Sequence, residues 1–131
     1  MQKKLTNKLI SKWSLQKPLY VDIKDKRYKN YVSQLRKNGF CDCETWALDS
    51  VISEFILPRL KRFKEVNNGF PVDVNEEKWN DILDRIIFSF EWNLIYNKQC
   101  EKLTSKENKI AWKKYNEGMK LFAKYFRDLW W

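Results

Sequence analysis

The chain of 131 residues carries a formal net charge of +9, and 44% of its residues are hydrophobic and 16% aromatic. This apolar content excludes a disordered chain, and three glycines and three prolines supply too few turns for an all-β fold. No apolar run approaches the roughly 18 residues of a transmembrane helix, so we expect no membrane association. The class that remains is a soluble, all-α protein.

The cysteines and the missing histidines limit the chemistry of the chain. No uninterrupted apolar stretch follows the basic start at residues 1–8, so we expect no secretory signal and three reduced thiols, at Cys41, Cys43 and Cys100. The absence of histidine removes the commonest general base and metal ligand. One Cys-x-Cys pair with a distant cysteine is a poor match to zinc sites. We therefore expect no metal ion, no cofactor and no enzymatic activity.

The positive charge is unevenly distributed. Residues 1–38 contain eleven Lys/Arg and two Asp, whereas residues 39–131 contain fifteen Lys/Arg and fifteen Asp/Glu. The prediction is therefore a single domain over residues 1–131, with a basic N-terminal segment (1–38) and a neutral helical body (39–131).

The basic segment is expected to contain two short helices. Four apolar residues share one side of the first: Leu5, Leu9, Ile10 and Trp13. Pro18 interrupts this pattern, and the alternation over residues 19–23 is typical of an extended segment. A second helix is predicted from about Lys26, with Gly39 as its C-terminal stop.

The first helix of the body is expected to be interrupted. Asp42 is the predicted N-cap, with Glu44 in the first turn. Apolar residues then mark the buried face: Leu48, Ile52, Phe55, Ile56, Leu60 and Phe63. Pro58 lies within this pattern, removes a backbone donor and crowds the carbonyl of Glu54. We therefore expect a kink or a break near residues 54–57.

Two further long helices follow a loop at residues 67–71. Asp73 and Asn75 compete as N-cap of the first of these, whose wide apolar stripe from Trp79 onward predicts heavy burial. Thr104 starts the last helix through a capping box with Glu107, three residues later. The apolar residues of that helix have near-heptad spacing: Trp112, Tyr115, Met119, Phe122, Phe126 and Leu129. The predicted fold is a small bundle of three long antiparallel helices plus the shorter helices of the basic segment.

Several short motifs of the body stand out. They are Gly39-Phe40-x-Asp42-x-Glu44-Thr45-Trp46-x-Leu48-Asp49, Ile56-Leu57-Pro58-Arg59-Leu60, Gly69-Phe70-Pro71, Glu77-x-Trp79-x-x-Ile82-Leu83, Phe90-Glu91 and Leu121-Phe122-x-x-Tyr125-Phe126-x-x-Leu129-Trp130. Together they resemble small uncharacterised proteins of bacteriophages and prophages, over about residues 39–131. The resemblance implies a phage protein in the cytoplasm of the bacterial host, with virion association as the alternative, and it implies no mechanism.

The basic segment is the main candidate for binding a partner. Its lysines and interleaved aromatic residues fit a phosphate backbone with stacked bases or an acidic protein surface, and they fit a solvated face without function equally well. No helix-turn-helix, zinc-finger or RNP signature favours nucleic acid. With two tryptophans of the body, the candidate residues are Lys3, Lys4, Lys8, Lys12, Trp13, Lys26, Arg27, Tyr28, Arg36, Lys37, Trp46 and Trp131.

Two other groups of residues carry weaker hypotheses. Asp81-x-x-Asp84 has the carboxylate spacing of helical, metal-dependent nucleotide hydrolases, although a solvated helix face explains these acids more simply. Trp46 and Asp49 are expected three residues apart on one helix face. Trp46 is then either a partner anchor or, as we favour, an indole packed at a helix end with its N–H bound to a carboxylate.

The leading expectation is a non-enzymatic phage accessory protein that binds a host or phage macromolecule, for example an inhibitor of a bacterial defence system. The alternatives are a nucleic-acid-binding or virion- and packaging-associated protein, and a metal-dependent nucleotide hydrolase. The near-heptad last helix and the terminal pair Trp130-Trp131 also allow a homodimer. Trp130 is expected to continue that helix and Trp131 to be exposed.

Overall fold

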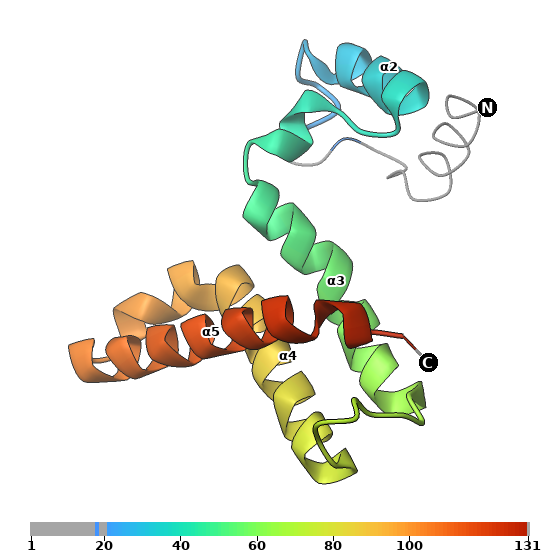
Figure 1. The fold of residues 1–131 in the computed structure, drawn as a ribbon. Helices are drawn as coiled ribbons and strands as arrows, with labels where there is room; N and C mark the ends of the chain where they lie inside the picture. The colour runs from blue at the N-terminus through green and yellow to red at the C-terminus, as the bar shows by residue number, and fades with distance from the viewer. Residues whose placement is uncertain (1–17, 19–20, 131) are drawn as a thin grey trace, which may run out of the picture. The chain divides into compact units, whose positions relative to one another are not determined.

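The computed structural model describes Pro18 and residues 21–130, and every regular element within them is helical (Figure 1). This confirms the all-α class, and no helix in the described part is long and apolar enough to cross a membrane. The chain forms two compact units, Met1–Leu48 and Asp49–Trp131. The helix predicted over residues 5–13 lies outside the described residues.

The first unit contains α2 (Tyr28–Asn38), which begins and ends close to where the sequence predicts. Gly39 has a φ of 82° in the left-handed region, and its N–H donates to the carbonyl of Leu35. Glycine adopts this conformation at little steric cost, so the helix stops here as expected. Tyr31 and Leu35 are the buried residues of the helix.

The start predicted for the first body helix is wrong. Asp42 opens a short 3₁₀ turn, η1 (Asp42–Thr45), and is not an N-cap. Its carboxylate accepts a hydrogen bond from the Gln34 side chain at 2.9 Å, and its N–H donates to the Gln34 amide oxygen at 2.8 Å. Gln34 thus occupies the Asp42 side chain. The carboxylate of Glu44 accepts a hydrogen bond from the backbone N–H of Cys41 instead, at 2.6 Å.

The state of two cysteines also differs from the expectation. Cys41 and Cys43 form a disulfide, and both residues are fully buried beside Tyr31 and Leu35. Cys100 is a free thiol. The expectation of reduced thiols is therefore wrong for Cys41 and Cys43. Their spacing, with one residue between them, did not indicate that they pair.

The next helix, α3 (Leu48–Val66), runs without interruption through Pro58, so the break expected there is absent and a bend stays a prediction. Pro58 is on the exposed side, where a missing backbone donor leaves the helix intact. The predicted buried face is correct only for the second half. Leu60 is buried, whereas Leu48 and Ile52 are about half exposed.

The central helix of the second unit is α4 (Glu76–Gln99). Asn75, and not Asp73, is its N-cap, because the Asn75 side chain accepts from the N–H of Lys78 at 2.8 Å. The heavy burial predicted for this helix is confirmed. Its buried residues are Trp79, Ile82, Leu83, Ile86, Ile87, Ser89, Phe90 and Trp92.

A short 3₁₀ turn, η2 (Cys100–Lys102), leads to α5 (Ser105–Tyr125). The capping box is confirmed: Thr104 Oγ1 accepts from the N–H of Glu107, and Glu107 accepts from the N–H of Thr104. This pairing holds the pKa of Glu107 below its usual value. α5 packs along α4, where the Phe90 and Phe122 rings meet edge to face with centroids 5.1 Å apart.

The last helix ends earlier than predicted. A 3₁₀ turn, η3 (Phe126–Asp128), follows α5, and Trp130 lies beyond it with 75% of its surface exposed. The expectation that Trp130 continues a core-bearing helix is therefore wrong. Tyr125 is the buried aromatic residue at this end, where its ring packs against Trp79 and its hydroxyl donates to Asp73 at 3.1 Å.

α4 and α5 approach most closely at Gly118. A Cβ added there would lie 1.9 Å from Ser89 Oγ and 2.3 Å from the carbonyl oxygen of Arg85. Gly118→Ala should therefore destabilise the fold by about 1–3 kcal/mol, even though alanine favours an isolated helix over glycine by about 1 kcal/mol. Urea unfolding followed by circular dichroism measures the change.

Gly69→Ala is the matched control, because the nearest heavy atom to an added Cβ there is 4.0 Å away. We expect its free energy of unfolding to stay within about 0.5 kcal/mol of that of the natural chain. A stabilised Gly118→Ala protein would show that the two helices do not approach this closely.

The disulfide predicts a thiol count. After denaturation without reductant, one of the three cysteines should react with a thiol reagent, and all three should react after reduction. Cys100→Ser should bring the count before reduction to zero. Three reactive thiols in protein prepared without reductant would contradict the pairing of Cys41 with Cys43.

Candidate partner-binding surface

The structure describes half of the candidate residues. Those that lie outside the described residues are Lys3, Lys4, Lys8, Lys12, Trp13 and Trp131. Those that it describes all belong to the first unit: Lys26, Arg27, Tyr28, Arg36, Lys37 and Trp46. Only this second group can be examined for geometry.

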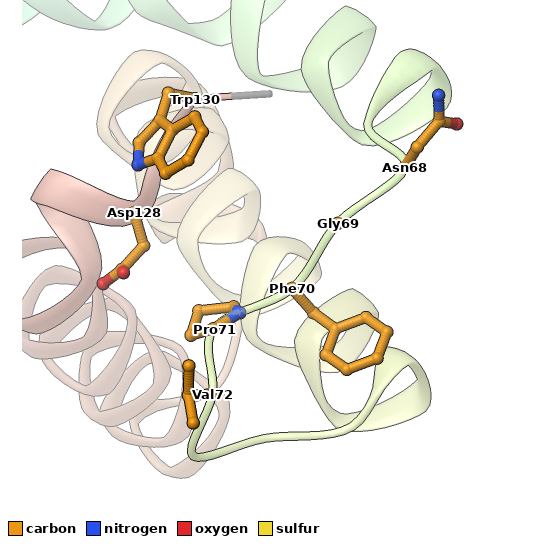
Figure 2. A pocket seen from close by; sticks show the side chains of 7 residues that line it. All are labelled: Asn68, Gly69, Phe70, Pro71, Val72, Asp128 and Trp130. Carbon is orange, nitrogen blue, oxygen red and sulfur yellow. The ribbon is translucent and has the colours of Figure 1, made fainter.

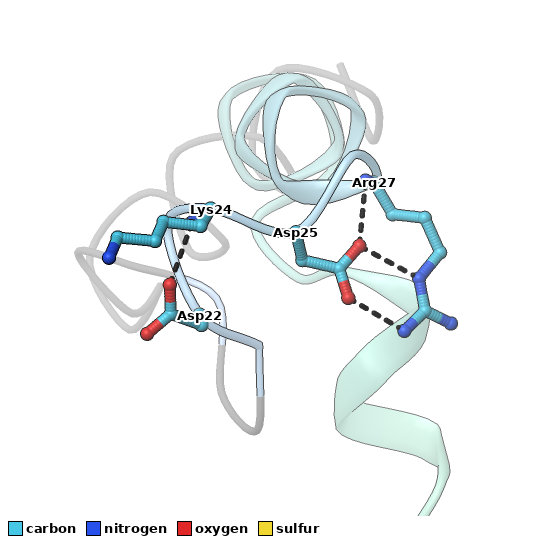
Figure 3. Close-up of polar contacts among 4 residues, drawn as sticks. All are labelled: Asp22, Lys24, Asp25 and Arg27. Carbon is cyan, nitrogen blue, oxygen red and sulfur yellow. Dashed lines mark hydrogen bonds and ion pairs between the residues drawn. The ribbon is translucent and has the colours of Figure 1, made fainter.

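The turn before α2 orients Arg27. Asp22 accepts a hydrogen bond from the N–H of Lys24 at 2.7 Å, which shapes the turn (Figure 3). Asp25 Oδ1 accepts from the Arg27 backbone N–H at 2.8 Å and from Nε at 3.1 Å, and Oδ2 accepts from Nη2 at 2.9 Å. This two-pronged contact fixes the plane of the guanidinium group.

The held guanidinium lies beside two aromatic rings. Its central carbon is 5.3 Å from the Trp46 ring centroid and 5.9 Å from that of Tyr31, and the two rings meet edge to face at 5.9 Å. Arginine at this distance from a ring makes a favourable cation–π contact. We call Asp25, Arg27, Tyr31 and Trp46 the Arg27 cluster.

Trp46 is placed differently from the prediction. It belongs to the turn between η1 and α3, so it does not share a helix face with Asp49. Its ring has Tyr31 and Arg27 as neighbours, and 51% of the residue is exposed. Asp49 instead accepts from the side chain of Asn93 on α4 at 3.1 Å.

The other described candidates are spread along α2. Lys26 is exposed next to Arg27, and Tyr28 is partly buried at the start of the helix. Arg36 and Lys37 are exposed in the last turn, where they complement the helix dipole. That turn is roughly 14 Å from Arg27 along the helix axis at 1.5 Å per residue. The structure therefore brings Arg27 and Trp46 together and leaves this pair apart from them.

Three acidic residues of α4 are engaged in ion pairs. Asp81 pairs with Arg85 at 2.9 Å, Asp84 with Lys64 at 2.5 Å, and Glu91 with Lys61 at 2.6 Å. Among the described residues, no group of three His, Cys, Asp or Glu side chains is arranged to hold a metal ion. The hydrolase hypothesis gains no support from these positions and stays a prediction.

A hollow of about 550 Å³ lies between the loop after α3 and the C-terminal end of the second unit (Figure 2). Its lining is mostly apolar: Asn68, Gly69, Phe70, Pro71, Val72, Asp128 and Trp130. The Gly-Phe-Pro motif predicted a loop, and no pattern in the chain indicated that this loop faces an exposed tryptophan. Asp128 supplies the single carboxylate of this lining, so the hollow has no pair of acids for catalysis.

The sequence reading missed an uneven distribution of charge within the body. Residues 39–103 contain eight Lys/Arg and twelve Asp/Glu, whereas residues 104–128 contain seven Lys/Arg and three Asp/Glu. The sum over the whole body hides this difference. Counting the charge helix by helix reveals that α5 is strongly basic.

Comparison of the chain with protein-family models, curated proteins and solved structures finds no match. The likeness to phage and prophage proteins therefore stays a prediction.

The Arg27 cluster predicts the titration of Asp25. The hydrogen bonds from the Arg27 side chain and then from its backbone N–H lower the pKa of Asp25 from 3.8 to about 2, and the same contact raises the pKa of Arg27. Because the pKa is lowered on folding, the contact stabilises the fold above pH 3.8, and this contribution is lost as the pH falls through about 2.

Arg27→Gln should move the pKa of Asp25 back toward 3.8, with a part of the shift left because the backbone N–H still donates. Carboxyl carbon chemical shifts in an NMR titration report this value. Arg36→Gln, which removes the same charge at the far end of α2, should leave it unchanged. An Asp25 pKa near 3.8 in the natural chain would show that the contact is not formed in solution.

Proposed function

We propose that this chain is a non-enzymatic protein that acts by binding a partner protein through the Arg27 cluster. The observation that carries this proposal is the half-exposed Trp46 ring, which is held between Tyr31 and an arginine that a carboxylate orients. An exposed aromatic ring that is already held in place loses little side-chain freedom when it binds.

The residue types favour a protein partner. Tryptophan, tyrosine and arginine are the side chains most enriched at the energetic centres of protein interfaces. Lys24 and Lys26 flank the cluster and are exposed, so an acidic partner surface fits best. The cluster is supplied by the turn before α2, by α2 itself and by the turn after η1, and the contact of Gln34 with Asp42 ties α2 to η1.

The biological setting proposed is a phage accessory protein in the cytoplasm of a bacterial host, where it inhibits a host protein such as a component of a defence system. The resemblance of residues 39–131 to phage and prophage proteins and the absence of histidine support this setting. A protein that acts by occupying a surface needs no catalytic group. Association with the virion is the alternative to the host cytoplasm. A homodimer is the alternative to a single chain.

We also propose that α3, α4 and α5 form an antiparallel bundle. Contacts between them run in opposite chain order: Asp49 of α3 meets Asn93 of α4, while Lys64 meets Asp84. Between α4 and α5, the Ser89 hydroxyl donates to the carbonyl of Tyr115 at 2.8 Å.

Capture of partners from a lysate of infected cells tests the proposal. The natural chain and the Trp46→Ala and Arg27→Gln variants are immobilised, the lysate is treated with nuclease, and captured proteins are identified and their affinities measured. Trp46→Ala should weaken the captured complex by about tenfold or more, the effect of removing a central interface tryptophan. Arg27→Gln should weaken it in the same direction.

Trp130→Ala is the matched control, because it removes an exposed tryptophan from the second unit. It should leave the complex unchanged. Circular dichroism confirms that each variant is folded. The proposal fails if nuclease treatment abolishes all capture, or if Trp130→Ala weakens the complex while Trp46→Ala does not.

A further inference from the structure

The lysines of α5 form a stripe on one side of the helix. We define the α5 lysine stripe as Lys106, Lys109, Lys113, Lys120 and Lys124, all of which are exposed. At 3.6 residues per turn these five positions fall within an arc of about 60°, and at 1.5 Å per residue they extend over about 27 Å. No acidic residue lies within the arc, and Glu117 at its edge lines a hollow with Arg85 and Lys114.

Packing of α5 on α4 fixes the direction in which the stripe points. Gly118, whose Cβ position is filled by α4, and Tyr115, whose carbonyl binds Ser89, lie on the α4 side of the helix. The helical rotation places the middle of the stripe about 180° from the middle of that side. The stripe therefore faces away from the core.

The ion pairs described in the second unit all join residues of α3 and α4. On α3 and α4, opposite charges pair within a helix, as Arg85 does with Asp81, or between helices, as Lys61 does with Glu91. None of the five stripe lysines has an ion-pair partner among the described residues. Like charges three or four residues apart destabilise a helix, and the stripe contains three such neighbouring pairs.

We propose that the α5 lysine stripe binds the phosphate backbone of a nucleic acid duplex. A B-form duplex carries one negative charge per about 1.7 Å of its axis, so a straight row of ammonium groups about 27 Å long faces many phosphates at once. Binding would relieve the repulsion between the lysines and release counterions from the duplex.

The composition of the stripe selects this partner over two others. Protein interfaces are depleted in lysine and enriched in aromatic residues and arginine, and the arc contains none of the latter. Single-strand binding depends on aromatic rings that stack with bases, and these are absent from the arc as well. Lysine contacts phosphate as a flexible point charge, so binding should be independent of base sequence.

A charge-matched pair of variants tests the proposal on the full chain. Lys113→Gln with Lys120→Gln removes two charges from the stripe, and Lys78→Gln with Lys98→Gln removes two exposed charges from α4. Fluorescence anisotropy with a short labelled DNA duplex gives the affinity as a function of salt concentration. Because each phosphate contact contributes about 0.9 to the slope of log K against log salt, the stripe variant should have a slope smaller by about two.

The α4 variant should keep the slope of the natural chain, and circular dichroism should show equal helix content in all three proteins. Equal slopes for the two variants would show that net charge alone, or the basic segment, governs binding, and would overturn the proposal. So would an absence of duplex binding by the natural chain at low salt. Stronger binding to a polyglutamate peptide of matched charge than to the duplex would assign the stripe to an acidic protein instead.

Discussion

The close approach of α4 and α5 at Gly118 is the contact on which the second unit depends. Any larger residue there would collide with Ser89 and with the α4 backbone, so the two helices meet in one register. That register brings Phe90 against Phe122 and Trp79 against Tyr125. It also decides which side of α5 is left for solvent, since the side opposite the contact carries the lysines.

Local signals in the sequence predicted local structure well. The capping box at Thr104 and the glycine after Asn38 each act within a few residues, so their outcome needs no tertiary information. Asp42 failed as a predicted cap because Gln34, eight residues earlier, occupies its side chain and its N–H. Trp130 failed because a helical period in the sequence cannot show that the helix ends at Tyr125. The errors therefore lie where distant residues compete with local preference.

The distribution of charge over the body was also missed, because it depends on more than local sequence. A net charge summed over the body is zero, and this value carries no information about where the charges lie. Three acids of α4 pair with bases on α3 and on α4 itself. The lysines of the α5 lysine stripe have no ion-pair partner among the described residues, because their side of α5 is turned away from α4. The neutral sum for the body thus conceals one helix that carries an excess of positive charge.

The two proposed surfaces differ in how their charges are held, and this difference implies different partners. Arg27 is fixed by Asp25 and lies beside Trp46, so it presents a defined geometry that suits one complementary protein surface. The lysines of the α5 lysine stripe are long and flexible and have no ion-pair partner among the described residues, so they present charge in no fixed geometry, which suits a regular phosphate backbone. A protein that used its basic residues only for solubility would need neither the carboxylate that orients Arg27 nor the separation of Lys from Glu on α5. The separation of lysine from glutamate along α5 has a physical cost in repulsion between like charges, and binding to an anionic partner offsets it.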